Sequence, residues 1–415
     1  MKMVIRILHI ALSFVILSAK ATVIEVSEGG SVTIETAIKK CEDGDTVLIR
    51  SGTYTENSIL VNKRITILGD DRPVIDAENE AADIFIITVD SVKIMGLILK
   101  NVATSYLKEY AAIKINRAAH GTISNNRILD CFFGVYLAYA KNYKVIDNEI
   151  IGNAKDEASA GNAIHAWKAS NLEIAYNEVT THRDGIYFEF VDDSEIHHNN
   201  SYRNLRYGLH FMFSNRDVYH HNEFTDSGAG VAVMFSKNIH MDDNIFKRNW
   251  GGASYGLLLK EISDGSISNN KFIQNTIGIL AEGASRLKMN KNQFTKNGTA
   301  LDMKGNCLEN EVSENNFLAN TFDVVTNSKY NTNSYSANYW SNYSGYDLDR
   351  DGIGDIPYRP VNLYAKITHE IPSATIMLQS FFVQLLDLGE RLFPQMIPEE
   401  LIDEKPMMRP YNYNL

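Results

Sequence analysis

The chain has 415 residues, 22% of them charged, and a formal net charge of −11 at pH 7. Three basic residues lie within the first 21 positions, so the chain without that segment carries −14. This acidity disfavours nucleic acid as a partner, because nucleic-acid binding depends on Lys and Arg side chains that neutralise phosphates.

Residues 1–21 have the pattern of a secretory signal peptide. A basic start is followed by an apolar stretch, and Ala19-Lys20-Ala21 forms a typical cleavage signal. The apolar stretch is shorter than the ~20 residues that span a bilayer. We therefore expect the mature chain to begin near Thr22 and to work outside the cytoplasm, without crossing a membrane itself.

Residues 22–45 are expected to form an N-terminal cap. The segment from Val32 to Cys41 has the pattern of a short amphipathic helix, and a β-rich run begins after Gly44. A stacked β fold needs such a cover, because its open end exposes apolar core and unpaired strand groups.

Residues 46–345 carry a repeat of about 22 residues. Its clearest mark is a series of asparagines, most of them 22 or 23 residues apart: Asn126, Asn148, Asn177, Asn199, Asn222, Asn244, Asn270, Asn292 and Asn315. A second Asn often follows five residues later, at Asn153, Asn249, Asn275, Asn297 and Asn320. Short alternating apolar runs at this period predict one solenoid turn per repeat. We therefore expect an all-β, right-handed, single-stranded parallel β-helix in which stacked Asn side chains bond to adjacent coils.

Alternation within each strand sorts the side chains into inward and outward columns. Counting from the small residue that opens each β-rich run, positions one and three are apolar and are expected to face the core. Positions two and four are therefore expected to face outward. The second position holds His165, Tyr187, His210, Ala232, Leu258, Leu280 and Asp302, and the fourth holds Trp167, Glu189, Met212, Met234, Lys260, Glu282 and Lys304.

Two hypotheses fit the outward columns between His165 and Lys260. Thioether and imidazole groups suit Cu(I), and His210, Met212 and Met234 could supply three ligands, with His165 as a further candidate. The other hypothesis is a protein-docking face without metal, since exposed apolar patches mark interaction sites. Its expected contact residues are Trp167, Tyr187, Glu189, Met212, Met234 and Lys260.

Two histidine pairs, His197-His198 and His220-His221, stand at the same point of successive coils. We interpret them either as surface filler or as a secondary metal site. The next coil has Asp242-Asp243 at this point, which suits a harder ion. The three cysteines, Cys41, Cys131 and Cys307, are interpreted as buried packing thiols, because Cys readily serves as a small hydrophobe.

Residues 346–371 are expected to close the solenoid. Asp347, Asp349, Asp351 and Asp355 have the spacing of the first part of a calcium loop. Tyr358 stands where such a loop has its bidentate Glu. A structural Ca²⁺ and an Asp-rich turn without metal therefore both stay open.

Residues 372–415 lack the repeat and are expected to form an amphipathic helical tail. Polar residues interrupt its apolar stretch too often for a membrane span. We expect the tail to dock on a membrane partner through Phe381, Phe382, Leu385 and Leu386.

Several motifs of the chain resemble the NosD family over nearly the whole mature length. They are Asp184-Gly-Ile-Tyr-Phe-Glu-Phe190, Leu205-Arg-Tyr-Gly-Leu-His-Phe-Met-Phe-Ser214, Gly230-Val-Ala-Val-Met-Phe-Ser-Lys237, Tyr255-Gly-Leu-Leu-Leu-Lys-Glu-Ile262, Tyr346-Asp-Leu-Asp-Arg-Asp-Gly-Ile-Gly-Asp355 and Pro357-Tyr-Arg-Pro360. The resemblance implies a periplasmic, non-enzymatic maturation protein that serves assembly of the copper–sulfur cluster of nitrous-oxide reductase in denitrification. As partners it implies an ABC-type ATPase reached through its membrane subunit, a copper chaperone lipoprotein and the apo-reductase. The complex would hold the protein at the inner membrane, where it handles Cu(I) transiently.

A carbohydrate-active β-helix enzyme (polysaccharide lyase, epimerase or glycosidase) is the alternative. Such an enzyme needs paired carboxylates ~5–10 Å apart, or an acidic and basic cluster, along an outward groove. Asp192-Asp193 is the best pair in the sequence, but it lies in an expected turn without catalytic companions.

Overall fold

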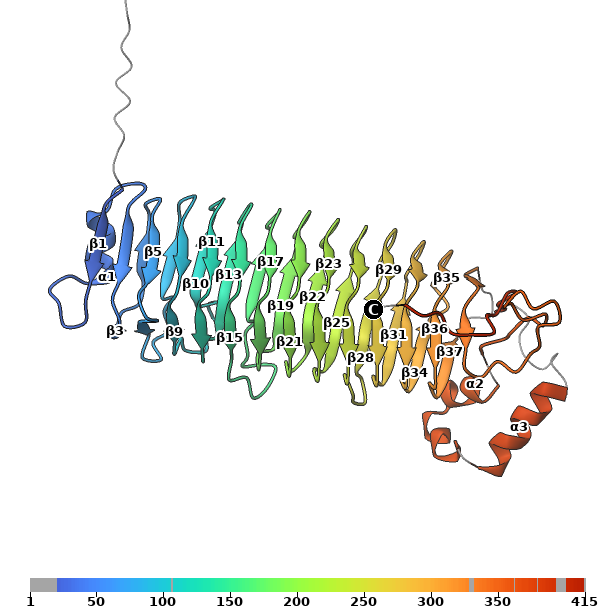
Figure 1. The fold of residues 1–415 in the computed structure, drawn as a ribbon. Coiled ribbons are helices and arrows are strands. Elements are labelled where there is room, and N and C mark those ends of the chain that lie inside the picture. Colours follow the sequence, from blue (N-terminus) through green and yellow to red (C-terminus); the bar gives the residue numbers. More distant parts are fainter. Residues whose placement is uncertain are drawn as a thin grey trace, which may run out of the picture.

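The computed structural model describes residues 21–105, 107–327, 332–361, 363–378, 380–392 and 401–413. The expected signal peptide lies outside the described residues, apart from its last residue. The described chain confirms the all-β fold: it is a right-handed parallel β-helix of about 14 turns with few helices. Figure 1 shows the coils stacked into one elongated rod, with the helices α2 and α3 at its C-terminal end.

Apart from those at the two ends, each coil contributes one strand to each of three parallel sheets, A, B and C. Sheet A consists of β1 Val23–Val26, β2 Thr46–Ile49, β5 Thr66–Gly69, β8 Lys93–Met95, β11 Thr122–Ser124, β14 Lys144–Ile146, β17 Glu173–Ala175, β20 Glu195–His197, β23 Val218–His220, β26 His240–Asp242, β29 Ser266–Ser268, β32 Lys288–Asn290, β35 Glu311–Ser313 and β38 Ser334–Ser336. Sheet B consists of β3 Thr53–Thr55, β6 Val74–Asp76, β9 Ile98–Lys100, β12 Arg127–Leu129, β15 Glu149–Ile151, β18 Glu178–Thr180, β21 Asn200–Tyr202, β24 Glu223–Thr225, β27 Ile245–Lys247, β30 Lys271–Ile273, β33 Gln293–Thr295, β36 Asn316–Leu318 and β39 Tyr339–Trp340. Sheet C consists of β4 Ile59–Val61, β7 Phe85–Ile87, β10 Ala111–Asn116, β13 Phe133–Ala138, β16 Ile164–Trp167, β19 Asp184–Glu189, β22 Tyr207–Met212, β25 Ala229–Met234, β28 Tyr255–Lys260, β31 Ile277–Glu282, β34 Thr299–Met303 and β37 Phe322–Thr326.

The interior of the rod is filled by columns of apolar side chains, one from each coil. Sheet B supplies the longest aromatic column, whose neighbouring rings lie 4.1–5.6 Å apart and nearly parallel: Phe224, Phe246, Phe272, Phe294, Phe317 and Trp340. Cys41, Cys131 and Cys307 are buried among these columns, and none of them forms a disulfide. Side chains of one coil pack directly on the equivalent side chains of the next coil, and this packing keeps the three sheets in register.

The predicted asparagine series forms a buried ladder between sheets A and B. The amide of Asn222, for example, donates to Asn244 Oδ1 at 3.0 Å and to the carbonyl of Ile196 at 2.9 Å. Its own Oδ1 accepts from Asn199 at 2.9 Å. Each Asn therefore bonds to the coils on both sides, as the sequence predicted, and buried turns keep their polar groups paired.

The N-terminal cap is partly built into the solenoid. The helix α1, Ile34–Lys40, lies within the predicted helical segment and covers the end of the core with Ile34, Ala37 and Ile38. Thr33 caps it by accepting from Thr36 N–H. The strand β1 already pairs in parallel with β2, so the expected cap region also supplies the first strand of sheet A.

The C-terminal region differs from the expected helical tail. Of its described residues, only those of α2 (Leu363–Glu370), the 3₁₀ helix η1 (Pro372–Met377) and α3 (Phe381–Leu392) are helical. Residues 401–413 instead return to the last coils, where Asp403 accepts hydrogen bonds from Asn338 and Trp340 and Tyr411 bonds to Asn316. The expectation of a helical tail is therefore wrong for residues 401–413, because this segment covers the open end of the solenoid, while docking by the tail stays a prediction. No described helix has both the length and the apolar character needed to cross a bilayer.

Candidate functional site

The outward side of sheet C from β16 to β28 is the candidate site, called here the sheet C face. Parallel register places His165 beside Tyr187 and Tyr187 beside His210. The sequence placed these three rings correctly on one column, but the expectation that they are exposed was wrong. Only 5% of His165, 9% of Tyr187 and 4% of His210 is exposed. The rings of successive coils cover one another, with centroids 4.9 and 4.7 Å apart.

The neighbouring outward column is more accessible and carries the two methionines. Met212 lies beside Met234 in register, and both side chains are half-buried. The Tyr187 hydroxyl donates to Met212 Sδ at 3.7 Å, which fixes the position of that thioether. Glu189 and Lys260 stand on either side of the methionine pair in the same column. Two soft ligands are thus held next to one another at the surface.

His210 is the third candidate ligand. Its protonation state suits metal binding, although only a small part of its side chain is exposed. Burial lowers its pKa despite the nearby carboxylate of Asp184, so the ring is neutral near pH 7 and keeps a lone pair. Neither ring nitrogen has a partner at hydrogen-bond distance, and Nδ1 lies 3.7 Å from Asp184 Oδ2. The donor set of His210, Met212 and Met234 therefore suits Cu(I).

His165 does not join this group. Tyr187 separates it from His210 along the column, and its Nδ1 lies 3.1 Å from the amide of Asn162. Burial lowers the pKa of His165 to about 3. His165 therefore lies two coils away from Met212 and three away from Met234, which is too far to share a metal ion with the methionine pair.

A buried ion pair supports the sheet C face and was missed from the sequence. Arg206 donates from Nε and Nη2 to the two carboxylate oxygens of Asp184 at 2.9 and 2.5 Å. Burial opposes ionisation of Asp184, but the nearby ring of His210 and the hydrogen bonds from Arg206 outweigh it and lower the pKa of the carboxyl. Asp184 stands three positions before Tyr187, so strict strand alternation predicts it on the opposite side of the sheet. The outward columns of the sequence therefore could not include it.

An exposed aromatic ladder, Phe190, Phe213 and Phe235, borders the methionine pair. Each residue directly follows the last residue of its strand and has a positive φ of 52–54°. The rings stack with centroids 5.1 Å apart, and they are 44%, 37% and 40% exposed. Alternation could not find them, because a left-handed residue breaks the two-residue period. A contiguous apolar patch of this kind is typical of a contact surface.

The Asp192-Asp193 pair, considered for carbohydrate chemistry, is bound by neighbouring side chains. Arg216 donates from Nε and Nη2 to both oxygens of Asp193 at 2.6 and 2.9 Å, and Asp192 accepts from Asn215. Hydrogen bonding to Arg216 lowers the pKa of Asp193, which disfavours a role as general acid. The pair therefore acts as a surface ion-pair cluster in a turn.

The predicted calcium residues are partly brought together. Asp347, Asp349 and Asp351 each offer a carboxylate oxygen within 4.8 Å of the others. Asp347 also accepts hydrogen bonds from the N–H groups of Arg350 and Gly352, and Asp355 accepts from Leu348 N–H. Three carboxylates are thus grouped in the loop, while Asp355 mainly holds its backbone, and calcium binding here stays a prediction.

The predicted docking residues of the tail divide into two groups. Phe381, Phe382 and Leu385 are 72%, 48% and 48% exposed on α3. Leu386 instead packs with Val383 against a small cluster that also contains Phe322 of β37. Leu386 is partly buried by this contact, which holds α3 on the solenoid, and its role in docking stays a prediction.

These features define a parallel β-helix protein with a soft-ligand and aromatic face on one sheet. Among solved structures, the Dettilon tailspike protein is similar over 71% of this chain and 66% of its own (TM-score 0.58, 12% identity). The exopolygalacturonase of Yersinia enterocolitica is similar over 77% and 78% (TM-score 0.54, 11% identity). At these identities the likeness concerns the fold alone.

Sequence comparisons point to a particular family. The family model described as periplasmic copper-binding protein (NosD) matches residues 154–345, which include the sheet C face. Two proteins named probable ABC transporter binding protein NosD are each 28% identical to this chain. The one from Stutzerimonas stutzeri matches over 316 residues (70% of each chain), and the one from Pseudomonas aeruginosa over 346 residues (78% and 79%). These matches confirm the resemblance to the NosD family.

Proposed function

We propose that this chain is a periplasmic accessory protein for assembly of the copper–sulfur cluster of nitrous-oxide reductase. It acts as the periplasmic component of an ABC-type complex at the inner membrane, whose ATPase it reaches through the membrane subunit. The observation that carries the proposal is that the copper-binding family match, residues 154–345, covers the coils with the paired thioethers of Met212 and Met234. The names of the relatives, as ABC transporter binding proteins, support the second part.

Copper is the cargo in this proposal, and Met212, Met234 and His210 hold it transiently as Cu(I). Thioether and neutral imidazole ligands favour the cuprous ion over harder cations. The methionines are half-buried, so an ion held there stays accessible to a partner. The hydrogen bond from Tyr187 keeps Met212 in place without occupying both lone pairs of its sulfur.

Two surfaces are proposed for the partners. The aromatic ladder, with Trp167, Glu189 and Lys260 around it, receives the copper chaperone lipoprotein or the apo-reductase. The exposed side of α3, with Phe381, Phe382 and Leu385, docks on the membrane subunit. Both surfaces combine exposed aromatic side chains with a polar surround, the usual composition of a protein interface.

Binding rather than catalysis is proposed for the sheet C face. Among the described residues of the sheet C strands β16, β19, β22, β25 and β28, Asp184 is the only fully buried carboxylate, and it is held by Arg206. Arg216 forms ion pairs with both Asp192 and Asp193. Neither arrangement supplies the accessible acid and base that a carbohydrate-active enzyme requires.

Deletion of the gene followed by isolation of the reductase tests this function. We expect reductase with its catalytic cluster depleted of copper, restored by the wild-type chain. A chain with Phe190→Ser, Phe213→Ser and Phe235→Ser should restore it poorly, and Phe382→Asp should lose the membrane subunit in co-purification. A full copper complement in the deletion strain contradicts the proposal, and turnover of an acidic polysaccharide by the purified chain would favour the enzymatic alternative.

We also propose that Asp347, Asp349, Asp351 and Asp355 bind a structural Ca²⁺ in the closing loop. Binding of a ligand to the folded state alone raises the melting temperature by an amount that grows with the logarithm of the ligand concentration above the dissociation constant. Added Ca²⁺ should raise the melting temperature by several degrees relative to excess chelator. The shift should vanish in an Asp349→Asn/Asp351→Asn chain, and an identical melting temperature in both conditions contradicts the site.

A further inference from the structure

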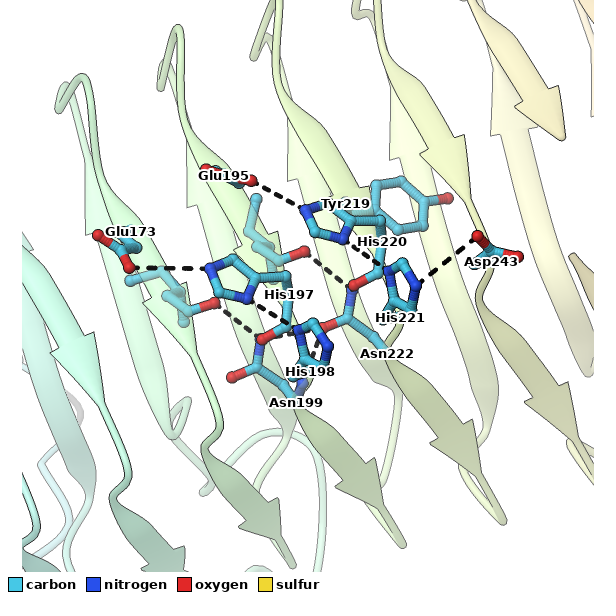
Figure 2. Close-up of polar contacts among 12 residues, drawn as sticks. Glu173, Glu195, His197, His198, Asn199, Tyr219, His220, His221, Asn222 and Asp243 are labelled. Carbon is cyan, nitrogen blue, oxygen red and sulfur yellow. Dashed lines mark hydrogen bonds and ion pairs between the residues drawn. The ribbon is translucent and has the colours of Figure 1, made fainter. Parts of the chain in front are cut away.

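The two histidine pairs form a compact cluster on sheet A, away from the sheet C face (Figure 2). His197 stacks on His220 with centroids 5.1 Å apart and an angle of 7°, and His198 stacks on His221 at 4.9 Å and 5°. The surrounding carboxylates come from three different coils. We call this group the histidine cluster.

The backbone brings the two rings of each pair together. His198 and His221 have a φ of 54°, in the left-handed region, directly after the last residue of β20 and of β23. This conformation breaks the strand alternation that would otherwise send consecutive side chains to opposite faces. As a result, the Nδ1 atoms of His197 and His198 lie 3.0 Å apart, and those of His220 and His221 lie 2.8 Å apart.

The turns that carry the histidines are held rigidly from inside. Asn199 Nδ2 donates to the carbonyl of His197, and Asn222 Nδ2 donates to that of His220, both at 3.0 Å. These amides belong to the buried asparagine ladder, so each turn is tied to the coils on both sides. A site on these turns is therefore preorganised, which reduces the cost of ordering its ligands on binding.

Carboxylates face the opposite nitrogen of the rings. Glu195 Oε1 lies 2.9 Å from His220 Nε2, and Asp243 Oδ2 lies 3.7 Å from His221 Nε2. A carboxylate accepts but does not donate, so His220 Nε2 is satisfied when it carries hydrogen, which leaves a lone pair on Nδ1 of the neutral ring. Asp243 is too distant to fix the tautomer of His221 in the same way. Across the 2.8 Å between the two Nδ1 atoms, either a hydrogen on His221 Nδ1 or a metal ion bound by both lone pairs satisfies the two rings.

We propose that His220 and His221 chelate a divalent transition-metal ion through their Nδ1 atoms, with Cu(II) bound most tightly. Two nitrogens 2.0–2.1 Å from one ion are ~2.9 Å apart at a right angle and ~3.3 Å apart in a tetrahedron. The observed separation of 2.8 Å matches the right angle. Tetragonal nitrogen sites suit Cu(II) and Ni(II), and the affinity order of the divalent ions favours Cu(II).

Glu195 is the positioning residue of this site, and Asp243 adds a nearby negative charge 3.7 Å from the second ring. A carboxylate that accepts from the second ring nitrogen fixes the tautomer and makes the first nitrogen a stronger ligand. His197 and His198 form a second, weaker site, because Glu173 lies 3.8 Å from His197 Nε2 and a second ion would be repelled by the first. The exposed rings of His198 and His221 leave both positions open to solvent.

Titration of the metal-free, full-length mature chain with Cu(II) against a competing chelator tests the site. We expect one tight and one weaker equivalent. His220→Gln/His221→Gln should lower the affinity of the tight step on the order of 100-fold, and Glu195→Gln roughly 10–100-fold. His197→Gln/His198→Gln should remove only the weaker step.

The matched control is His240→Gln, which changes an exposed histidine on the next coil whose Nδ1 contacts Ser266 Oγ. It should leave both steps unchanged, as should Met212→Ala/Met234→Ala, which addresses the separate Cu(I) proposal. Electron paramagnetic resonance of the wild-type chain with one Cu(II) should show coupling to imidazole nitrogen. Unchanged tight binding in the folded His220→Gln/His221→Gln chain, or a wild-type spectrum without that coupling, overturns the site.

Discussion

Asp184 and Asp217 are both fully buried, yet their pKa values are shifted in opposite directions. Burial favours the protonated acid in each case. At Asp184, the nearby ring of His210 and the hydrogen bonds from Arg206 outweigh burial and lower the pKa. Asp217 receives a backbone hydrogen bond from Ser194, and burial raises its pKa to about 8. The two residues therefore give the protein opposite responses to pH.

Asp217→Asn should stabilise the protein near neutral pH. An unfolded Asp titrates near pH 4, so between about pH 4 and pH 8 the folded state binds more protons than the unfolded state. Stability therefore falls as pH rises through this window, and an amide avoids that loss. We expect a gain on the order of 3 kcal/mol in the free energy of unfolding at pH 7 and little gain at pH 4. Urea unfolding at both pH values measures it, and an equal gain at both contradicts the assignment.

Arg206→Ala should strongly destabilise the fold, because it leaves the Asp184 carboxylate buried without its main partner. Removing one partner of a buried ion pair costs about 3–5 kcal/mol. The pKa of Asp184 is lowered in the folded state, so the contribution is present above the usual carboxyl range and is lost as pH falls through the folded pKa. The control is Arg216→Ala, whose pair with Asp193 is exposed and should matter far less. Similar losses in the two variants would contradict this account.

The asparagine ladders are the elements that hold successive turns together. Asn275 donates to the carbonyl of Phe246 and to Asn297 Oδ1, and it accepts from the backbone and side chain of Asn249. A column of such residues pairs the polar groups of the buried turns and leaves the hydrogen bonds between the strands intact. The regular 22-residue spacing in the sequence follows directly from this contact between coils.

Asn275→Ala should lower the free energy of unfolding by about 2–4 kcal/mol, because it leaves buried groups on two adjacent coils unpaired. Asn153 is the matched control: its spacing fits the same series, but the structure leaves it exposed. Asn153→Ala should change stability by less than about 0.5 kcal/mol. Equal effects of the two substitutions, measured by thermal or urea unfolding, would show that the ladder is not a stabilising element.

Strand alternation and period predicted the coils, the inward columns and the membership of the outward columns. They could not predict that His165, Tyr187 and His210 are buried, because that burial comes from rings on different coils covering one another. They also could not find Phe213, because the left-handed residue after each strand lies outside the two-residue period. Contacts between elements, rather than local patterns, decide both points.

The closing segment 401–413 shows the same limit at longer range. Tyr411 bonds to Asn316, 95 residues earlier, and Asp403 bonds to Asn338, 65 residues earlier. No local spacing in the sequence predicts either contact. The carboxylate of Asp403 replaces the next asparagine of the ladder, which is why a segment without the repeat can end it.

The rod as a whole brings the proposed surfaces to one side of the molecule. Helix α3 packs, through Val383, on the cluster containing Phe322 and Val325 of β37, which belongs to the same sheet as the methionine pair. Four strand spacings separate β25 from β37, a distance of ~19 Å along the rod. A partner held by α3 could therefore contact the methionine pair directly, while the histidine cluster on sheet A stays free.

The central claim is that this rigid rod presents a cuprous ion site at Met212 and Met234. Anaerobic titration of the mature chain with Cu(I) against a competing chelator tests it most directly. We expect Met212→Ala/Met234→Ala to weaken binding on the order of 100-fold, since it removes two of three ligands. The control Met95→Ala, which removes a half-buried thioether on sheet A, should leave the affinity unchanged. Wild-type affinity in the folded Met212→Ala/Met234→Ala chain would contradict the account.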